Sequence, residues 1–127
     1  MDKKDKKTIL IVDDNADTRL VLSARLKTLQ YHTVFAADAL QAMSVALRER
    51  PDAILLDLGL PGGNGLLVLE RFKANISLGD IPVIIDTADD PQVAEARAIE
   101  AGAVAFLQKP VDHDKLIKTV EQALGIT

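Results

Sequence analysis

Short apolar runs and longer stretches of mixed polarity alternate along the whole chain. The first run, Thr8 to Val12, is apolar at every position after the first, which is typical of a strand buried on both faces of a parallel sheet. Four further short runs indicate strands at 33–36, 53–56, 83–87 and 105–107. Because a stretch with helical spacing follows each run, the pattern predicts an α/β fold with helices on both faces of one sheet.

Capping residues mark where the expected helices begin and end. Asp17 or a neighbour can cap the first helix, Asp38 the second, and Asp90 followed by Pro91 the fourth, which Gly102 ends. The side chains expected to face the core are Leu20, Val21, Ala24, Leu26 and Leu29 in the first helix, Leu40, Ala42, Met43, Ala46 and Leu47 in the second, Leu66, Leu67, Leu69 and Phe72 in the third, and Leu116, Ile117, Val120 and Leu124 in the last.

Composition narrows the class of protein further. The 127 residues suit one compact domain, and 48% hydrophobic with 27% charged residues disfavours disorder. A net charge of −4 lacks the basic excess expected for direct nucleic-acid binding. No apolar run is long enough for a membrane span, and the absence of cysteine excludes disulfides and thiolate chemistry, so we expect a cytoplasmic protein without a membrane partner.

Polar residues that could carry chemistry follow the expected strands directly. Asp13 and Asp14 come after the first strand, Asp57 after the third, Thr87 closes the fourth, and Lys109 follows the fifth. Ligands of open α/β sheets bind beyond the carboxyl ends of the strands. With a strand order of 2-1-3-4-5, three carboxylates would meet at one edge, with a hydroxyl and an ammonium nearby. Taken singly, the two adjacent acids could instead cap a helix, Thr87 could be an ordinary strand residue, and Lys109 a solvated charge.

Three clustered carboxylates need positive charge, and ligands that are all oxygen point to Mg²⁺. This ion is typically held by one or two carboxylates together with waters and a phosphate. An aspartate carboxylate can attack phosphorus when a metal ion and a lysine neutralise the incoming charge, and the product is an acyl phosphate. The hydroxyl of Thr87 could donate to a phosphoryl oxygen.

Five separated motifs carry a resemblance to a known family. They are Ile-Val-Asp13-Asp14-Asn, Leu-Leu-Asp57-Leu-Gly-Leu-Pro-Gly-Gly-Asn-Gly65, Ile-Pro-Val-Ile-Ile-Asp-Thr87-Ala88, Gly-Ala followed by Phe106-Leu, and Lys109-Pro. In this order they resemble the response regulator receiver domains of two-component signalling in bacteria, from Thr8 to Leu124. The resemblance implies a single doubly wound, flavodoxin-like sheet of five parallel strands in the order 2-1-3-4-5 with five helices. We expect residues 8–127 to form this receiver domain and residues 1–7 to be a flexible tail.

The resemblance also implies a role for each acidic residue. Asp57 is expected to accept a phosphoryl group from a sensor histidine kinase or a histidine phosphotransfer protein. Mg²⁺ would be held by Asp14, Asp57 and the main-chain carbonyl of Gly59, with Asp13 acting mainly through water. The protein would be a signalling switch that catalyses only its own phosphorylation and dephosphorylation.

The same resemblance assigns the switch residues. Lys109 is expected to pair with the phosphoryl group, Thr87 to move and bond it, and Phe106 to follow Thr87 inward. The small side chain of Ala88 leaves the phosphoryl pocket open. The repacked face of the fourth helix, fifth strand and fifth helix would meet a downstream output domain or protein, or a second copy in a homodimer.

Several positions depart from the family pattern or carry expectations of their own. Asp86 stands where an apolar residue is usual, so it either reaches the sheet edge, is hydrogen-bonded inside, or is protonated with a raised pKa; we expect an edge or hydrogen-bonded position. Gly59 leaves Asp57 open to water, and Phe106 lacks the hydroxyl of the common tyrosine. The resemblance suggests a cis bond between Lys109 and Pro110.

Three other functions fit parts of the pattern. A Mg²⁺-dependent phosphatase of the haloacid dehalogenase type uses an aspartate nucleophile, but its Asp-x-Asp signature is missing, because Asp13 and Asp14 are adjacent. A flavodoxin-like flavin carrier would need a hydroxyl-rich phosphate loop and aromatic walls. An unphosphorylated receiver fold could serve only as an interaction module, although the set of Asp57, Thr87 and Lys109 argues against it.

Overall fold

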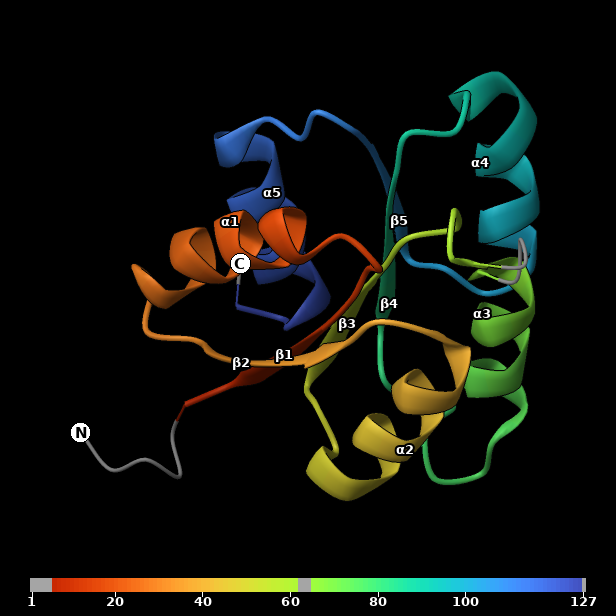
Figure 1. The fold of residues 1–127 in the computed structure, drawn as a ribbon, viewed down its shortest axis with the longest axis horizontal. Coiled ribbons are helices and arrows are strands. Elements are labelled where there is room, and N and C mark those ends of the chain that lie inside the picture. Colours follow the sequence, from red (N-terminus) through yellow and green to blue (C-terminus); the bar gives the residue numbers. More distant parts are fainter. Residues whose placement is uncertain (1–5, 62–64, 127) are drawn as a thin grey trace.

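Ten elements alternate between strand and helix in the computed structural model, which describes residues 6–61 and 65–126 (Figure 1). The turn residues Gly62, Gly63 and Asn64 and most of the expected tail lie outside the described residues. In chain order the elements are β1 (Thr8–Val12), α1 (Ala16–Lys27), β2 (His32–Ala36), α2 (Ala39–Glu49), β3 (Ala53–Leu56), α3 (Gly65–Ala74), β4 (Val83–Thr87), α4 (Pro91–Glu100), β5 (Ala105–Gln108) and α5 (His113–Ala123).

The five strands form one parallel sheet in the order β2-β1-β3-β4-β5, as predicted. Helices α1 and α5 lie on one face of the sheet, and α2, α3 and α4 lie on the other (Figure 1). In the register of the central strands, Ile11 lies beside Leu55 and Leu55 beside Ile84. The strands therefore end at a common edge, and the residues that follow them are brought together there.

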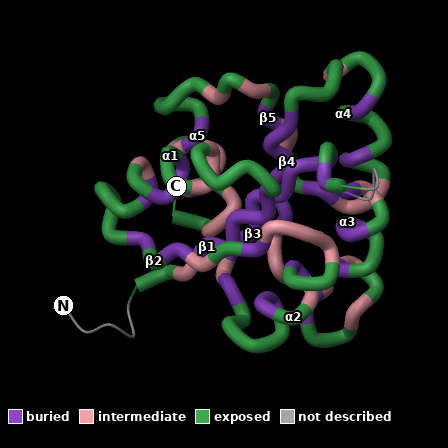
Figure 2. The backbone as a smooth tube through the Cα atoms, viewed as in Figure 1, coloured by how far each residue is buried: buried purple, intermediate pink, exposed green. Residues whose placement is uncertain are grey.

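The core consists of two apolar clusters separated by the sheet. One cluster, under α2, α3 and α4, includes Leu56, Phe72 and Ile85. The other, under α1 and α5, includes Leu55 and Ile84. Because successive strand side chains point to opposite faces, the apolar runs of the central strands supply both clusters, and the central part of the sheet is buried throughout (Figure 2).

Capping side chains hold the helices where the sequence indicates, with one change. Asn15, rather than Asp17, caps α1, and its side chain accepts a hydrogen bond from the backbone of Thr18 at 2.9 Å. Asp38 caps α2 and Asp90 caps α4, as predicted. The short loop after β1 places Asn15 directly before the first turn of α1. Asn and Asp are equally good capping residues.

The inner face of α1 differs from the prediction. Four residues expected in the core are exposed: Ala24, and Leu20, Val21 and Leu29 with exposed fractions of 64%, 49% and 41%. The buried side chains are Leu22, Ser23 and Leu26. Ser23 faces the sheet because its hydroxyl shares a 2.7 Å hydrogen bond with that of Thr33 on β2. This buried polar pair therefore lies, with Leu22 and Leu26, on the face of α1 that packs against the sheet.

Helices α2 and α3 bury fewer large side chains than predicted. Leu40, Leu47 and Leu67 are exposed. In α2 the residues against the sheet are Ala42, Val45 and Ala46. Small side chains on this face let the helix lie close to the strands, and the larger leucines remain outside the contact.

Candidate functional site

Three acidic side chains meet where β1 and β3 end. One carboxylate oxygen from each of Asp13, Asp14 and Asp57 lies within 4.8 Å of the other two. The two strands are neighbours in register, and the backbone amide of Asp57 donates to the carbonyl of Val12 at 3.0 Å. The arrangement of the sheet therefore brings together carboxylates from two segments far apart in the chain, as the sequence predicts.

Lys109, which follows β5 at the same edge of the sheet, also reaches this cluster. Its Nζ donates to Asp13 Oδ2 at 2.7 Å and to Asp57 Oδ2 at 3.0 Å. The lysine follows β5, where its backbone amide donates to the carbonyl of Thr87 at 2.8 Å, and the bond to Pro110 is cis, as expected. Burial alone would lower the pKa of Lys109, but the hydrogen bonds and attraction of the two carboxylates outweigh it and raise that pKa.

The three acids differ in burial and in how fully they are bonded. Asp13 and Asp57 are buried, whereas Asp14 is exposed. Asp13 Oδ1 accepts from the amide of Asn15 at 2.8 Å, so both of its oxygens are engaged once the bond from Lys109 is counted. Asp57 Oδ1 accepts from the amide of Gly59 at 2.8 Å. One ammonium faces three carboxylates, which leaves the cluster with an excess of negative charge.

Gly59 leaves one side of Asp57 uncovered. A Cβ at this position would lie 3.4 Å from Asp57 Oδ1, so any larger side chain would begin directly against that carboxylate. Gly59 is exposed, whereas Asp57 is buried. The expectation that Gly59 admits water or a small phosphoryl donor stays a prediction.

The hydroxyl-bearing and aromatic candidates lie close to the same edge but do not contact the acids through a hydrogen bond. Thr87 is fully buried at the end of β4, and its Oγ1 accepts from the amide of Asp89 at 3.3 Å. Ala88 follows it and is exposed. Phe106 on β5 is partly buried against the core cluster under α2, α3 and α4, with Ile85 of β4 beside it in register. Thr87 and Phe106 thus belong to neighbouring strands.

Asp86 lies neither at the hydrated edge nor in a fully hydrogen-bonded position, and that expectation was wrong. Its side chain points from β4 toward α1, it is only 2% exposed, and within residues 6–61 and 65–126 its Oδ1 has no hydrogen-bond partner. Its pKa is raised to about 6, mainly by burial and also by the negative charges of Asp13 and Asp57, while Lys109 and Arg25 act in the opposite direction. The third possibility considered from the sequence, a raised pKa, is the one that this environment supports.

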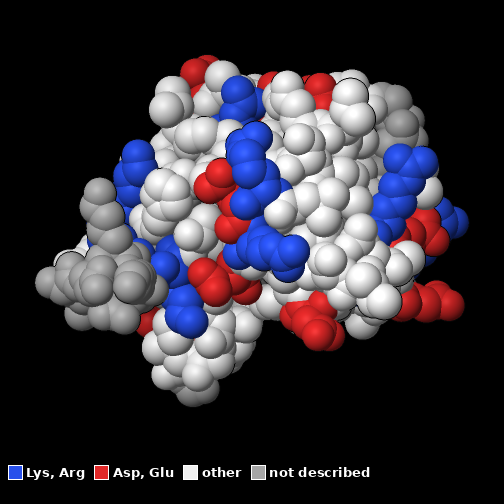
Figure 3. All heavy atoms as spheres, turned by 90° about the horizontal axis from the view of Figure 1, so that it is seen from below, with Lys and Arg blue, Asp and Glu red and all other residues white. Residues whose placement is uncertain are grey.

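The remaining observations concern the surface and the helices. His32 and His113 are exposed. In Figure 3, several Lys and Arg side chains lie next to one another near the middle of the face shown, with Asp and Glu side chains beside them. Among the described residues, every helix is too short or too polar to cross a bilayer.

Comparisons with known proteins place this geometry in a family. A sequence signature described as the response regulator receiver domain matches residues 9–121. The chain is 35% identical over 121 residues to the phosphate regulon transcriptional regulatory protein PhoB of Pseudomonas aeruginosa, covering 95% of this chain but only 53% of PhoB. It is 37% identical over 118 residues to sporulation initiation phosphotransferase F of Bacillus subtilis, covering 93% of this chain and 94% of that protein.

A solved structure gives the same result for the fold. The receiver domain of a sensor histidine kinase from Pseudomonas aeruginosa, which has a magnesium ion coordinated in its active site cleft, superposes with a TM-score of 0.85 at 32% identity. The match covers 94% of this chain and 98% of that one. The signature, the sequence relatives and the superposition agree over nearly the whole chain. The chain therefore belongs to the response regulator receiver domain family.

Proposed function

We propose that the chain is a phosphoacceptor switch in which Asp57 receives a phosphoryl group from a sensor histidine kinase or a histidine phosphotransfer protein. The observation that carries this proposal is the meeting of Asp57 with Asp13, Asp14 and Lys109 at the edge of the sheet. In the transfer, a carboxylate oxygen of Asp57 attacks phosphorus, the bond from phosphorus to the donor nitrogen breaks, and the released imidazole keeps the electron pair.

The residues present fit Mg²⁺. The ligands offered are all oxygen, and the exposed carboxylate of Asp14 has no side-chain hydrogen bond within residues 6–61 and 65–126. Asp14, Asp57 and the carbonyl of Gly59 would hold the ion, and Asp13 would act mainly through water. When bound, the ion supplies positive charge next to the transferred phosphoryl oxygens.

Lys109 and Thr87 would hold the phosphoryl group once it is transferred. Lys109 already donates to Oδ2 of Asp57, the residue on which the group would be built, so it needs only a short movement to bond a phosphoryl oxygen. Thr87 would exchange its weak 3.3 Å bond with Asp89 for a bond to that group, with Ala88 leaving room for it. Phe106 would then occupy space vacated by Thr87.

This rearrangement would change the face formed by α4, β5 and α5. We propose residues 8–127 as the receiver domain and this face as the surface that binds a downstream output domain or protein, or a second copy of the chain. A coupling between Asp57 and this face is expected because β4 and β5 are adjacent in the sheet.

Intact-mass measurement after incubation with acetyl phosphate tests the proposal. In the presence of Mg²⁺ the wild-type chain should gain the mass of one phosphoryl group, and EDTA should prevent the gain. The Asp57→Asn variant keeps the shape of the side chain but lacks the nucleophile, and it should gain nothing. An equal gain in the variant would overturn the assignment of Asp57, and no gain in either protein would favour an unphosphorylated interaction module.

A further inference from the structure

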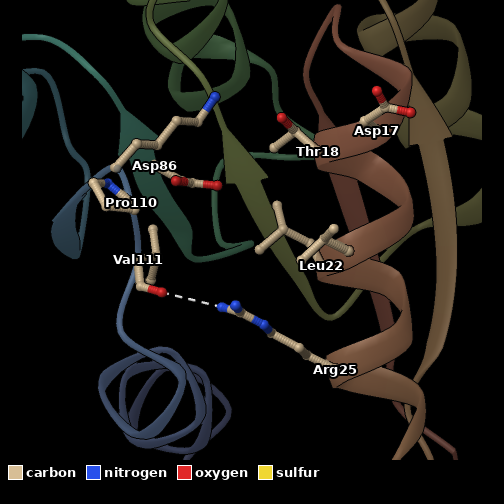
Figure 4. A pocket seen from close by; sticks show the side chains of 9 residues that line it. Asp17, Thr18, Leu22, Arg25, Asp86, Pro110 and Val111 are labelled. Atoms are coloured by element: carbon tan, nitrogen blue, oxygen red, sulfur yellow. Dashed lines mark hydrogen bonds between the residues drawn. The ribbon is translucent and has the colours of Figure 1, made fainter.

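A second concave site lies beside the acidic cluster, between α1 and the segment that follows β5. The cavity measures about 470 Å³, within the range of small-molecule pockets, about 300–1,000 Å³. Its walls include Val21 and Leu22 of α1 and Pro110 and Val111 of the opposing segment (Figure 4). None of these side chains belongs to the proposed phosphorylation site.

The inner wall of this cavity carries a buried carboxyl group. Asp86 is only 2% exposed to solvent, and its side chain points from β4 into the space in front of Leu22 (Figure 4). Within the part of the chain that the structure describes, its Oδ1 lacks a hydrogen-bond partner. A buried carboxyl oxygen that is left unsatisfied lowers stability, so a ligand that supplies a donor here gains more than the same donor would gain in water.

The two cations that line the cavity are both engaged elsewhere. Lys109 Nζ is bonded to Asp13 and Asp57. Arg25 Nη1 donates to the carbonyl of Val111 at 3.0 Å, across the cavity from Asp86 (Figure 4). Neither residue donates a hydrogen bond to Asp86, and the carboxyl group therefore lacks a positively charged partner of its own.

The remaining walls decide the shape and polarity of a ligand. Val21, Leu22, Pro110 and Val111 present mainly carbon, so a ligand must carry an apolar body to gain from filling the space. A bare metal ion does not fit, because one carboxylate cannot supply the several oxygens that Mg²⁺ or Ca²⁺ requires. An anion would meet repulsion from Asp86 at the inner wall.

We propose that this cavity binds a small organic cation, a primary amine on a short branched hydrocarbon, with its ammonium donating to Asp86 and its apolar body against Val21, Leu22 and Val111. The inference goes beyond the proposed function and does not depend on phosphorylation of Asp57. It rests on the unsatisfied Oδ1 of Asp86, on the bonds that Arg25 and Lys109 make to other groups, and on the apolar walls of the cavity.

The test compares isopentylamine with isopentanol, which has nearly the same size but no charge. Backbone amide shifts are followed by nuclear magnetic resonance at saturating Mg²⁺, so that the amine does not compete with the metal ion for the acidic cluster. The variants are Asp86→Asn, which removes the charge with little change of shape, and Asp86→Val, which serves if the amide variant does not fold. Asp17→Asn is the matched control, because Asp17 is an exposed acid lining the same cavity.

Isopentylamine should produce saturable shifts at Leu22, Asp86 and Val111, and its affinity should be about tenfold or more above that of isopentanol. Asp86→Asn and Asp86→Val should each lose about tenfold in affinity for the amine, whereas Asp17→Asn should stay within about threefold of the wild type. Equal binding of amine and alcohol, unchanged affinity in both Asp86 variants, or the absence of saturable shifts would each overturn the proposal.

Discussion

Lys109 donates a hydrogen bond to Asp57 at 3.0 Å although 52 positions separate the two residues in the chain. The contact crosses from the end of β5 to the end of β3, with β4 between them. Because Lys109 bonds Asp13 at the same time, one ammonium compensates two buried carboxylates. This ion pair links the stability of the fold to the charge state of the site.

Removing the ammonium should destabilise the protein. In Lys109→Met the buried carboxylates of Asp13 and Asp57 lose the only cationic side chain that donates to them among the described residues, and we expect a loss of about 2 kcal/mol in the free energy of unfolding without metal. Added Mg²⁺ should restore more stability to the variant than to the wild type. Urea unfolding followed by circular dichroism measures both effects. Lys115→Met, at an exposed position of α5, is the control, and equal losses in the two variants would contradict the role given to Lys109.

Magnesium affinity should depend on Asp14 without a large change in stability. Asp14 is exposed, so Asp14→Asn removes a ligand charge but disturbs no buried contact. We expect the affinity for Mg²⁺ to fall by about tenfold or more, because affinity follows the number of charged oxygen ligands. Isothermal titration calorimetry measures this change. Asp17→Asn, two residues into α1, should bind Mg²⁺ like the wild type, and similar weakening in both variants would point to a diffuse charge effect instead.

Replacement by alanine should affect stability very differently at Gly65 and at Gly59. A Cβ at Gly65 would lie 2.3 Å from the Cα of Leu58, whereas the nearest atom to a Cβ at Gly59 is 3.4 Å away. We therefore expect Gly65→Ala to lose about 2–3 kcal/mol through overpacking against backbone. Gly59→Ala should change stability by less than about 0.5 kcal/mol. Thermal unfolding of the pair distinguishes them, and comparable midpoints would show that the start of α3 can move away from Leu58.

Replacing Asp86 should stabilise the protein most at neutral pH. Its pKa rises from 3.8 to about 6 on burial, so between about pH 4 and pH 6 the folded state holds a proton that the unfolded state has released. The free energy of unfolding therefore falls as pH increases through this window, and above pH 6 the whole penalty, about 3 kcal/mol, is present.

The Asp86→Val variant lacks this penalty. Its stability relative to the wild type should increase by about 3 kcal/mol between pH 4 and pH 7 in metal-free buffer. The charged neighbours Lys109, Asp13, Asp57 and Arg25 are present in both proteins, so a comparison at each pH largely cancels their own titration. Urea unfolding at several pH values measures the difference. A stability difference that does not change with pH would show that Asp86 keeps an ordinary pKa.

The strands and the acidic cluster could be predicted from sequence because each rests on a local signal. An unbroken apolar run such as Ile9 to Val12 indicates a strand buried on both faces, and an acid directly after it must lie at the edge of the sheet. Once the strand order is given, the meeting of Asp13, Asp14 and Asp57 follows. The same strand order places the end of β5 near this cluster, and the side chain of Lys109 is long enough to reach Asp13 from there.

The inner faces of helices and the position of Asp86 could not be predicted in this way. Helix α1 has apolar residues on several sides, and its buried face includes Ser23, whose bond to Thr33 joins two residues that periodicity does not connect. Asp86 looks like an edge residue because it stands one position before Thr87. Its burial arises from α1 and the segment after β5 closing over it, a contact between distant parts of the chain.

Reductive trapping of the phosphorylated chain tests the central claim most directly. Borohydride reduces an aspartyl phosphate to homoserine, and peptide sequencing by mass spectrometry then identifies the modified position. After incubation with acetyl phosphate and Mg²⁺, we predict homoserine at position 57 and unmodified Asp13 and Asp14. Homoserine at position 13 or 14, or no conversion at position 57 in a chain that has gained phosphoryl mass, would contradict the account.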